Sequence, residues 1–126
     1  MQSVLLVFFA GGVGSALRYA TGVVALQLLG PNFPWGTLAV NLVGCAVMGV
    51  FARVLPLPEA GVPTARLLLM TGLLGGYTTF SAFSLDAANL WMRNEQGAAI
   101  TYVAASVIGG LAAVTLGLFA GKALFS

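Results

Sequence analysis

The residues from Gly75 to Ser84, GGYTTFSAFS, place four serine and threonine hydroxyls and two phenylalanines directly after a pair of glycines. On a helix, Phe80 and Phe83 share one face, and Ser81 and Ser84 share a neighbouring face. Phenylalanines in an apolar chain usually face lipid or fill a core. Beside hydroxyls, however, the electropositive ring edges offer a small anion weak, nearly anhydrous contacts. The segment therefore predicts a path through which an anion passes without being held too tightly to leave.

The same segment is expected to interrupt a helix. Gly72, Gly75 and Gly76 each weaken a helix by about 1 kcal/mol relative to alanine, and the hydroxyls of Thr78 and Thr79 can compete for backbone partners. Irregular backbone at membrane depth persists only where it is buried in protein or lines a watery cavity. Its freed carbonyls can coordinate a cation, as they do where two half-helices meet in transporters.

Two further pairs of polar residues lie inside apolar stretches. Thr37 and Asn41 are four residues apart, and so are Tyr102 and Ser106, so that each pair shares a helical face. Such residues either make ordinary hydrogen bonds between helices, each worth about 0.6 kcal/mol, or line the path of an ion. The sequence leaves both interpretations open.

Two charged residues need an explanation, because a charge inside a membrane span costs about 2.5–3.5 kcal/mol on insertion scales. Arg18 is the only charged residue before Arg53. It either reaches to the nearer membrane interface or remains buried and raises the local potential for an anion. Asp86 lies toward the end of the third apolar stretch, where it either faces an aqueous vestibule or pairs with an arginine.

The elements that must position these residues are four apolar stretches. The chain has 126 residues, of which 60% are hydrophobic and 6% charged, whereas about a quarter of the residues of a soluble domain are charged. A helix crosses the bilayer with about 20 apolar residues, and residues 4–29, 36–55, 66–91 and 98–123 are long enough. We therefore predict an all-α integral membrane protein, one transmembrane domain over residues 1–126, with the third helix broken near its middle.

Several function classes are disfavoured. The chain has no histidine and a single cysteine, Cys45, so histidine-based metal sites and Ser-His or Cys-His nucleophiles are ruled out. There is no pair of convergent carboxylates, and GGVGSA lacks the third glycine of a nucleotide-binding fingerprint. We expect the protein not to be an enzyme. The net charge of +2 reflects few acidic residues rather than a basic patch, so no nucleic-acid partner is expected.

The charge distribution indicates a weak preference for orientation. Four spans place both termini and the second loop on one side of the membrane. That side carries Arg53, Arg66 and Lys122, and the other carries Arg93 and, if it reaches the interface, Arg18. Lysines and arginines in short loops set orientation, and a difference of one or two is small. The chain could thus insert both ways and pair with an inverted copy of itself.

Sequence blocks in all four stretches resemble the Fluc (CrcB) fluoride channels: GGVGSALRY, WGTLAVNLVG, TGLLGGYTTFSAFS and TYVAASVIGG. The resemblance covers the whole chain. It implies an antiparallel, dual-topology homodimer in the plasma (inner) membrane of a prokaryote. Such a dimer exports fluoride passively through two pores and holds a structural sodium ion at its centre.

The resemblance also implies roles for individual residues. Phe80 and Phe83 match the family's phenylalanines whose ring edges contact fluoride, and Asn41 matches its pore asparagine. The backbone carbonyls of Gly75 and Thr78 from both subunits would hold the sodium ion. The remaining positions expected along the pore are Thr37, Thr79, Ser81, Ser84, Tyr102 and Ser106, and those expected to set the electrostatics of the vestibule are Arg18 and Asp86.

Three positions depart from the family's pattern. Ala82 stands where relatives often have threonine, and Gly110 and Val114 stand where serine and threonine are frequent. These changes thin the track of hydroxyls but leave the phenylalanines, the asparagine and the glycines in place.

Two other membrane functions remain as alternatives. A small-multidrug-type exporter also has about four spans and dual topology, but it needs a buried carboxylate to exchange protons and drug. The first stretch here has none, and Asp86 is the sole candidate. A non-conducting membrane subunit would explain the glycines but not the clustered hydroxyls or the broken third span.

Overall fold

The computed structural model describes residues 1–59 and 61–125, and all regular secondary structure in these ranges is helical. The third span is composite, and the helices are α1 (Gln2–Leu29), α2 (Trp35–Val54), α3 (Thr64–Arg66), the π-helix η1 (Leu67–Leu74), α4 (Gly75–Tyr77), α5 (Phe80–Met92) and α6 (Gln96–Phe125). Within the described ranges, four helical segments are long and apolar enough to cross a membrane. The predicted all-helical fold with four membrane-spanning segments is confirmed, and each predicted bound lies within two residues of the observed one.

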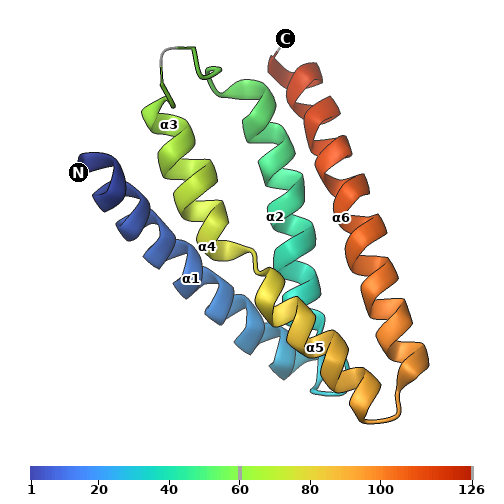
Figure 1. Cartoon of the computed structure of the whole chain (residues 1–126). Helices are drawn as coiled ribbons and strands as arrows, with labels where there is room; N and C mark the ends of the chain where they lie inside the picture. Colours follow the sequence, from blue (N-terminus) through green and yellow to red (C-terminus); the bar gives the residue numbers. More distant parts are fainter. Residues whose placement is uncertain (60, 126) are drawn as a thin grey trace.

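Short connections set the up-and-down course of the chain. Gly30 ends α1 with a left-handed φ of 82°, which glycine adopts without the penalty of a Cβ. Arg66 holds the far end of α2, because its guanidinium donates hydrogen bonds to the carbonyls of Ala52 at 2.9 Å and Pro56 at 2.6 Å. Figure 1 shows the C-terminus beside the connection between α2 and α3, and the other two connections at the opposite end.

Glycines bring α2 and α6 into direct backbone contact. A Cβ added to Gly49 would collide with the carbonyl of Val114, and one added to Gly117 would collide with the carbonyl of Ala46. Because lipid tails are as apolar as the side chains they would contact, helices in membranes associate through such close approach. We call this contact the α2–α6 seam.

A second seam joins α1 to the first half of the third span. A Cβ on Gly14 would collide with the carbonyl of Leu73, and one on Gly76 would collide with the backbone of Gly11. The glycines before the break therefore remain helical and serve close packing. Gly75, for example, has φ −60° and ψ −36°.

The third span is interrupted at two threonines. Thr78 (φ −87°, ψ 158°) and Thr79 (φ −151°, ψ 121°) are extended, so the predicted break is confirmed, although it falls after the glycines rather than at them. Figure 1 shows α5 leaving the direction of α3 and α4 after this linker and approaching the lower part of α6. The break thus redirects the chain between two helices.

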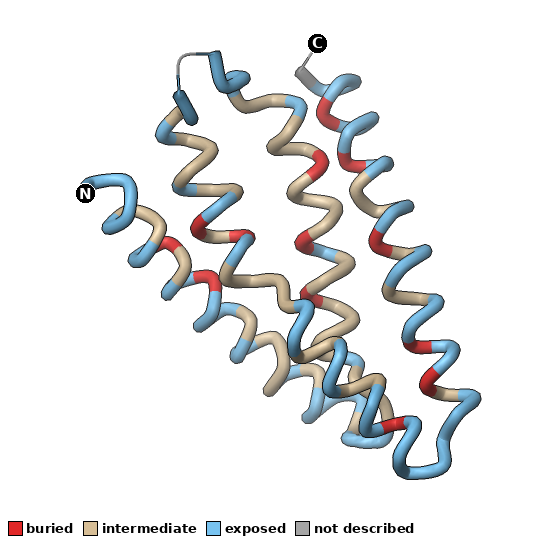
Figure 2. The backbone as a smooth tube through the Cα atoms, viewed as in Figure 1, coloured by how far each residue is buried: buried red, intermediate tan, exposed pale blue. Residues whose placement is uncertain are grey.

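The chain buries few large side chains. Figure 2 shows buried residues scattered along the helices rather than gathered at one centre. A small cluster of Leu90, Ala99 and Tyr102 lies between α5 and α6, and Phe33 and Phe83 pack against it. Most of the other large apolar side chains lie on the outside, as expected of a chain surrounded by lipid.

Candidate functional site

Asn41 on α2 binds both backbone groups of one residue at the break, Thr79. Its Nδ2 donates a hydrogen bond to the carbonyl of Thr79 at 3.0 Å, and its Oδ1 accepts one from the N–H of Thr79 at 2.8 Å. The side-chain amide therefore replaces the backbone partners that Thr79 would have inside a helix. Of the two interpretations left open for Asn41, an interhelical hydrogen bond is observed, and the second Nδ2 hydrogen remains for another acceptor.

α1 binds the residues just before the break. Arg18 Nε donates to the carbonyl of Gly76 at 3.1 Å, and the hydroxyls of Thr21 and Tyr77 are 3.1 Å apart. Arg18 is half-buried and is directed at the backbone of the third span, so it does not reach for the membrane interface. The sequence interpretation missed Thr21 and Tyr77, although Thr21 lies three residues after Arg18 and so shares its helical face.

Thr79 also begins the helix that follows the break. Its Oγ1 accepts a hydrogen bond from the N–H of Ala82 at 3.1 Å and lies 3.3 Å from the Oγ of Ser81. This is an N-cap, in which a side-chain oxygen satisfies one of the free N–H groups of the first turn. The first turn of α5 carries a partial positive charge, and Phe80 and Phe83 extend from it.

The two phenylalanines are neighbours, as their spacing predicts. Their ring centroids are 5.6 Å apart, and that of Phe83 is 5.3 Å from that of Tyr102. Phe80 is 78% exposed, whereas Phe83 is half-buried against the cluster between α5 and α6. The three rings therefore lead from the outer surface of the single chain to its interior.

Tyr102 links this row of rings to Asp86. Its side chain is fully buried, and its hydroxyl donates to Asp86 Oδ2 at 3.2 Å. Arg93 forms its ion pair with Glu95, at 2.6 Å, and not with Asp86. Asp86 instead faces a pocket of about 330 Å³, whose wall also includes Thr37.

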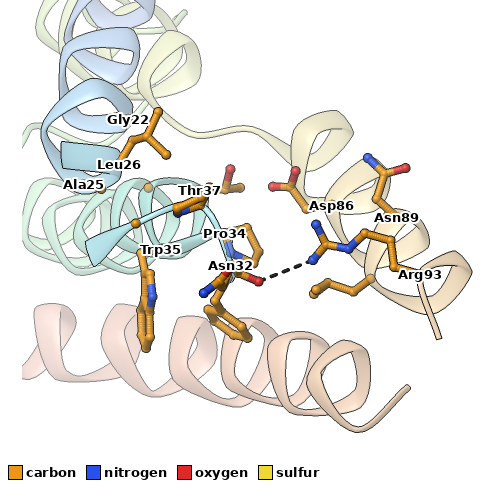
Figure 3. Close-up of a pocket in the computed structure, with 15 residues that line it drawn as sticks. Gly22, Ala25, Leu26, Asn32, Pro34, Trp35, Thr37, Asp86, Asn89 and Arg93 are labelled. Carbon is orange, nitrogen blue, oxygen red and sulfur yellow. Dashed lines mark hydrogen bonds between the residues drawn. The ribbon is translucent and has the colours of Figure 1, made fainter. Parts of the chain in front are cut away.

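Two adjoining pockets connect the loop end of the molecule to the break. Figure 3 shows Asp86 on α5 and Arg93, directly after this helix, extending toward the residues around the start of α2. The second pocket, of about 610 Å³, is lined by Arg18 and Thr79, and both pockets have Thr37 in their walls. We call the two pockets together the vestibule; Asp86 lines the first pocket and Arg18 lines the second.

The other predicted pore residues lie in different surroundings. Ser81 and Ser84 are exposed on α5. The Oγ of Ser106 is buried, and no group in the described part of the chain lies within hydrogen-bond distance of it. Of the departures from the family's pattern, Ala82 lines the second pocket and Gly110 is buried near Cys45. The structure thus brings Asn41 and Arg18 to the break, places Ser81 beside Thr79, and leaves Ser84 and Ser106 apart from them.

A family model described as CrcB-like protein, Camphor Resistance (CrcB), matches residues 5–118. This match includes every residue of the break, the vestibule and the row of rings. The chain belongs to the CrcB family.

Relatives of almost the same length have a functional name. The chain is 54% identical over 124 residues to a protein of Rhizobium johnstonii, with 98% of this chain and 99% of the relative covered. It is 55% identical, with the same coverage, to a protein of Rhizobium etli, and 46% identical to one of Agrobacterium fabrum, covering 99% of this chain and all of the relative. All three are named fluoride-specific ion channel FluC.

The sodium site implied by the resemblance to the CrcB family can be tested against the hydrogen bonds at the break. In a continuous α-helix, the carbonyls of Gly75 and Thr78 would accept from the N–H groups of Thr79 and Ala82. Both donors are engaged elsewhere, with Asn41 Oδ1 and with Thr79 Oγ1. The two carbonyls implicated in sodium binding are therefore among those that lose their helical donors at the break, and the residues fit a cation held by backbone oxygens.

Proposed function

We propose that this chain forms a fluoride-specific ion channel, through which fluoride leaves the cell down its electrochemical gradient. The observation that carries this proposal is the similarity over nearly the full length of the chain to relatives named fluoride-specific ion channels. The row of rings beside the helix break supports it, because ring edges suit a small anion that must bind weakly.

Fluoride enters through the vestibule and loses water on the way to the break. Arg18 raises the potential for an anion there, while its hydrogen bond to the Gly76 carbonyl satisfies part of its own charge. Beyond the vestibule, the ion contacts the ring edges of Phe80 and Phe83 and the free Nδ2 hydrogen of Asn41. The hydroxyl positions proposed along its way are Thr37, Thr79, Ser81, Ser84, Tyr102 and Ser106.

The functional unit of this proposal is an antiparallel homodimer in the inner membrane of a bacterium. Phe80, Ser81 and Ser84 are exposed on the single chain, and a second, inverted copy would cover them and complete two pores. The small difference in loop charge permits both orientations. The carbonyls of Gly75 and Thr78 from both subunits would hold the sodium ion, whose charge ties the subunits together at the centre of the dimer.

The multidrug-exporter alternative receives no support from the site. The carboxylate that such an exporter would use for proton exchange is Asp86, and the buried hydroxyl of Tyr102 donates to it. Proton exchange with bulky cations would need this carboxylate to be free. The names of the relatives also favour a channel.

The direct test is fluoride efflux from liposomes that contain the purified protein, measured with a fluoride electrode. We expect rapid fluoride release and no comparable chloride release. Phe80→Ile and Phe83→Ile should each slow fluoride efflux about tenfold, because a lost ring contact of about 1.5 kcal/mol at the barrier corresponds to that factor.

Phe119→Ile is the matched control, since Phe119 is 65% exposed on α6 and should behave like the unsubstituted protein. Liposomes that release no fluoride would refute the channel. Normal efflux from both Phe80→Ile and Phe83→Ile would refute the assignment of the path to these rings.

A further inference from the structure

We propose that Asn41 is a positioning residue that opens the cation site, by drawing the N–H of Thr79 away from the carbonyl of Gly75. This inference rests on the proposed function for the identity of the cation as sodium. Asn41 is already expected to contact fluoride. The inference gives it a second role, which is to hold the backbone at the break, and this role does not require fluoride.

The first step is the competition for one N–H group. In a continuous α-helix the N–H of Thr79 donates to the carbonyl of Gly75, four residues earlier. Here Asn41 Oδ1 accepts that hydrogen at 2.8 Å. The Gly75 carbonyl then needs another partner, since an unpaired backbone group is costly in a membrane. Gly75 is exposed on the single chain, so an ion can reach it.

The second step frees the other carbonyl. Asn41 Nδ2 donates to the Thr79 carbonyl at 3.0 Å and so holds Thr79 extended, at φ −151° and ψ 121°. In this conformation the Thr79 hydroxyl caps α5 by accepting from the N–H of Ala82 at 3.1 Å. That N–H would otherwise donate to the carbonyl of Thr78. One amide on α2 therefore controls both carbonyls.

Arg18 satisfies one of the neighbouring carbonyls. The carbonyl of Gly76 lies between those of Gly75 and Thr78 in the sequence, and Arg18 Nε binds it at 3.1 Å. Among the residues that the structure describes, no group of three Asp, Glu or Cys side chains could hold a metal ion. Backbone oxygens that have lost their helical donors can serve as ligands, and sodium is a cation that unwound helices coordinate in this way.

Sodium binding to the purified full-length protein tests the inference without fluoride. Thermal unfolding would be followed in detergent while NaCl replaces N-methylglucamine chloride at constant ionic strength. A ligand that binds only the folded state raises its stability as the ligand concentration rises. The stabilisation follows RT ln(1 + [Na⁺]/Kd), so a fit to its concentration dependence gives the sodium midpoint, the concentration at which half of the folded protein holds sodium.

Asn41→Leu removes both hydrogen bonds and should raise this midpoint at least about tenfold, a change of about 1.4 kcal/mol in binding. Asn41→Asp keeps the oxygen that accepts from Thr79 but loses the Nδ2 donor, so it should raise the midpoint by less than Asn41→Leu does, by about threefold or less than about 1 kcal/mol. Gln27→Leu is the matched control, because Gln27 is an exposed amide near the end of α1. It should leave the midpoint unchanged.

Thr79→Val serves if Asn41→Leu does not fold. It keeps the β-branched shape but lacks the oxygen that caps α5, so it should raise the sodium midpoint through the Thr78 carbonyl. An unchanged midpoint in Asn41→Leu, or in Thr79→Val where that variant replaces it, would overturn the inference.

The inference and the channel can fail separately. An unsubstituted protein that releases fluoride but gains no stability from sodium would refute the inference and leave the channel standing. A protein that conducts no fluoride, yet loses sodium binding with Asn41→Leu, would refute the channel and support the role of Asn41 at the break.

Discussion

The α2–α6 seam and the break in the third span are both internal contacts, but they are held by opposite means. In the seam, glycines let one backbone touch the other, and Gly49 and Gly117 leave no room for a Cβ. At the break, polar side chains of neighbouring helices bind a backbone that has left the helix, as Asn41 and Arg18 do. One region excludes side chains, and the other depends on them.

The difference shows how a chain in lipid obtains specific contacts without a hydrophobic driving force. Moving an apolar side chain from lipid into protein gains little free energy, so which helices associate depends on how closely their backbones can approach. A backbone segment that has left the helix is stable only where its N–H and C=O groups have hydrogen-bond partners. The seam should therefore respond to added volume and the break to lost hydrogen bonds.

The largest effect should come from filling the seam. Gly117→Leu places a side chain against the carbonyl of Ala46 and the Cα of Gly49, where only backbone movement could make space. We expect destabilisation of more than about 3 kcal/mol and a large loss of monodisperse protein in size-exclusion chromatography. Gly12→Leu is the control, because nothing lies within 4 Å of its Cβ position. A normal yield of Gly117→Leu with normal fluoride efflux would show that the seam is not close-packed.

Much of the fold could be predicted from the sequence because membrane spans have a simple requirement. Four apolar stretches of sufficient length gave the four spans, and Thr78 and Thr79 marked the place where the third one opens. The function of the glycines was harder to predict. Gly76 weakens an isolated helix, but in the folded chain its contact with Gly11 keeps it helical, and sequence spacing alone does not reveal which backbone will approach.

A smaller effect should follow from removing a hydrogen bond at the break. Arg18→Gln deletes the guanidinium that binds the Gly76 carbonyl, a hydrogen bond to a charged group that is worth about 1.5–3 kcal/mol. We expect fluoride efflux to fall about tenfold. Arg18→Lys should recover little of it, because a single ammonium does not reproduce the Nε geometry.

Ionic strength separates this hydrogen bond from a long-range field. The Debye length falls from about 10 Å at 0.1 M salt to about 3 Å at 1 M, so a purely electrostatic effect of Arg18 should fade as an impermeant salt is added. A loss caused by the broken hydrogen bond should persist. A defect of Arg18→Gln that disappears in 1 M salt would mean that the break does not depend on this contact.

Neighbours on one helix could be predicted from the sequence, but contacts between helices at the candidate site could not. Phe80 and Phe83 are neighbours because they are three positions apart on a helix, and this requires no tertiary information. The attachment of Asn41 to Thr79 joins residues 38 positions apart, and depends on how α2 meets the break. The carboxylate of Asp86 presented the same difficulty, since its buried partner Tyr102 lies on another helix.

The smallest effect should come from Tyr77, where the two kinds of contact meet. Tyr77 is the last residue of α4, its hydroxyl lies 3.1 Å from that of Thr21, and a Cβ on Gly14 would also crowd its backbone N–H. Tyr77→Phe and Thr21→Val should each lower stability to thermal unfolding slightly, by about 0.6 kcal/mol, as is usual for hydrogen bonds between membrane helices.

The double variant decides whether the two regions are independent. If the hydroxyl contact acts alone, Tyr77→Phe and Thr21→Val together should cost no more than either one, with a coupling energy of about 0.6 kcal/mol. Sodium binding should then be unchanged, because the carbonyls of Gly75 and Thr78 depend on Asn41. A coupling above about 2 kcal/mol together with a shifted sodium midpoint would contradict this. It would show that the glycine packing around α4 and the polar contacts at the break form a single cooperative unit. Close backbone packing and hydrogen bonding of polar groups would then not be separate sources of specificity.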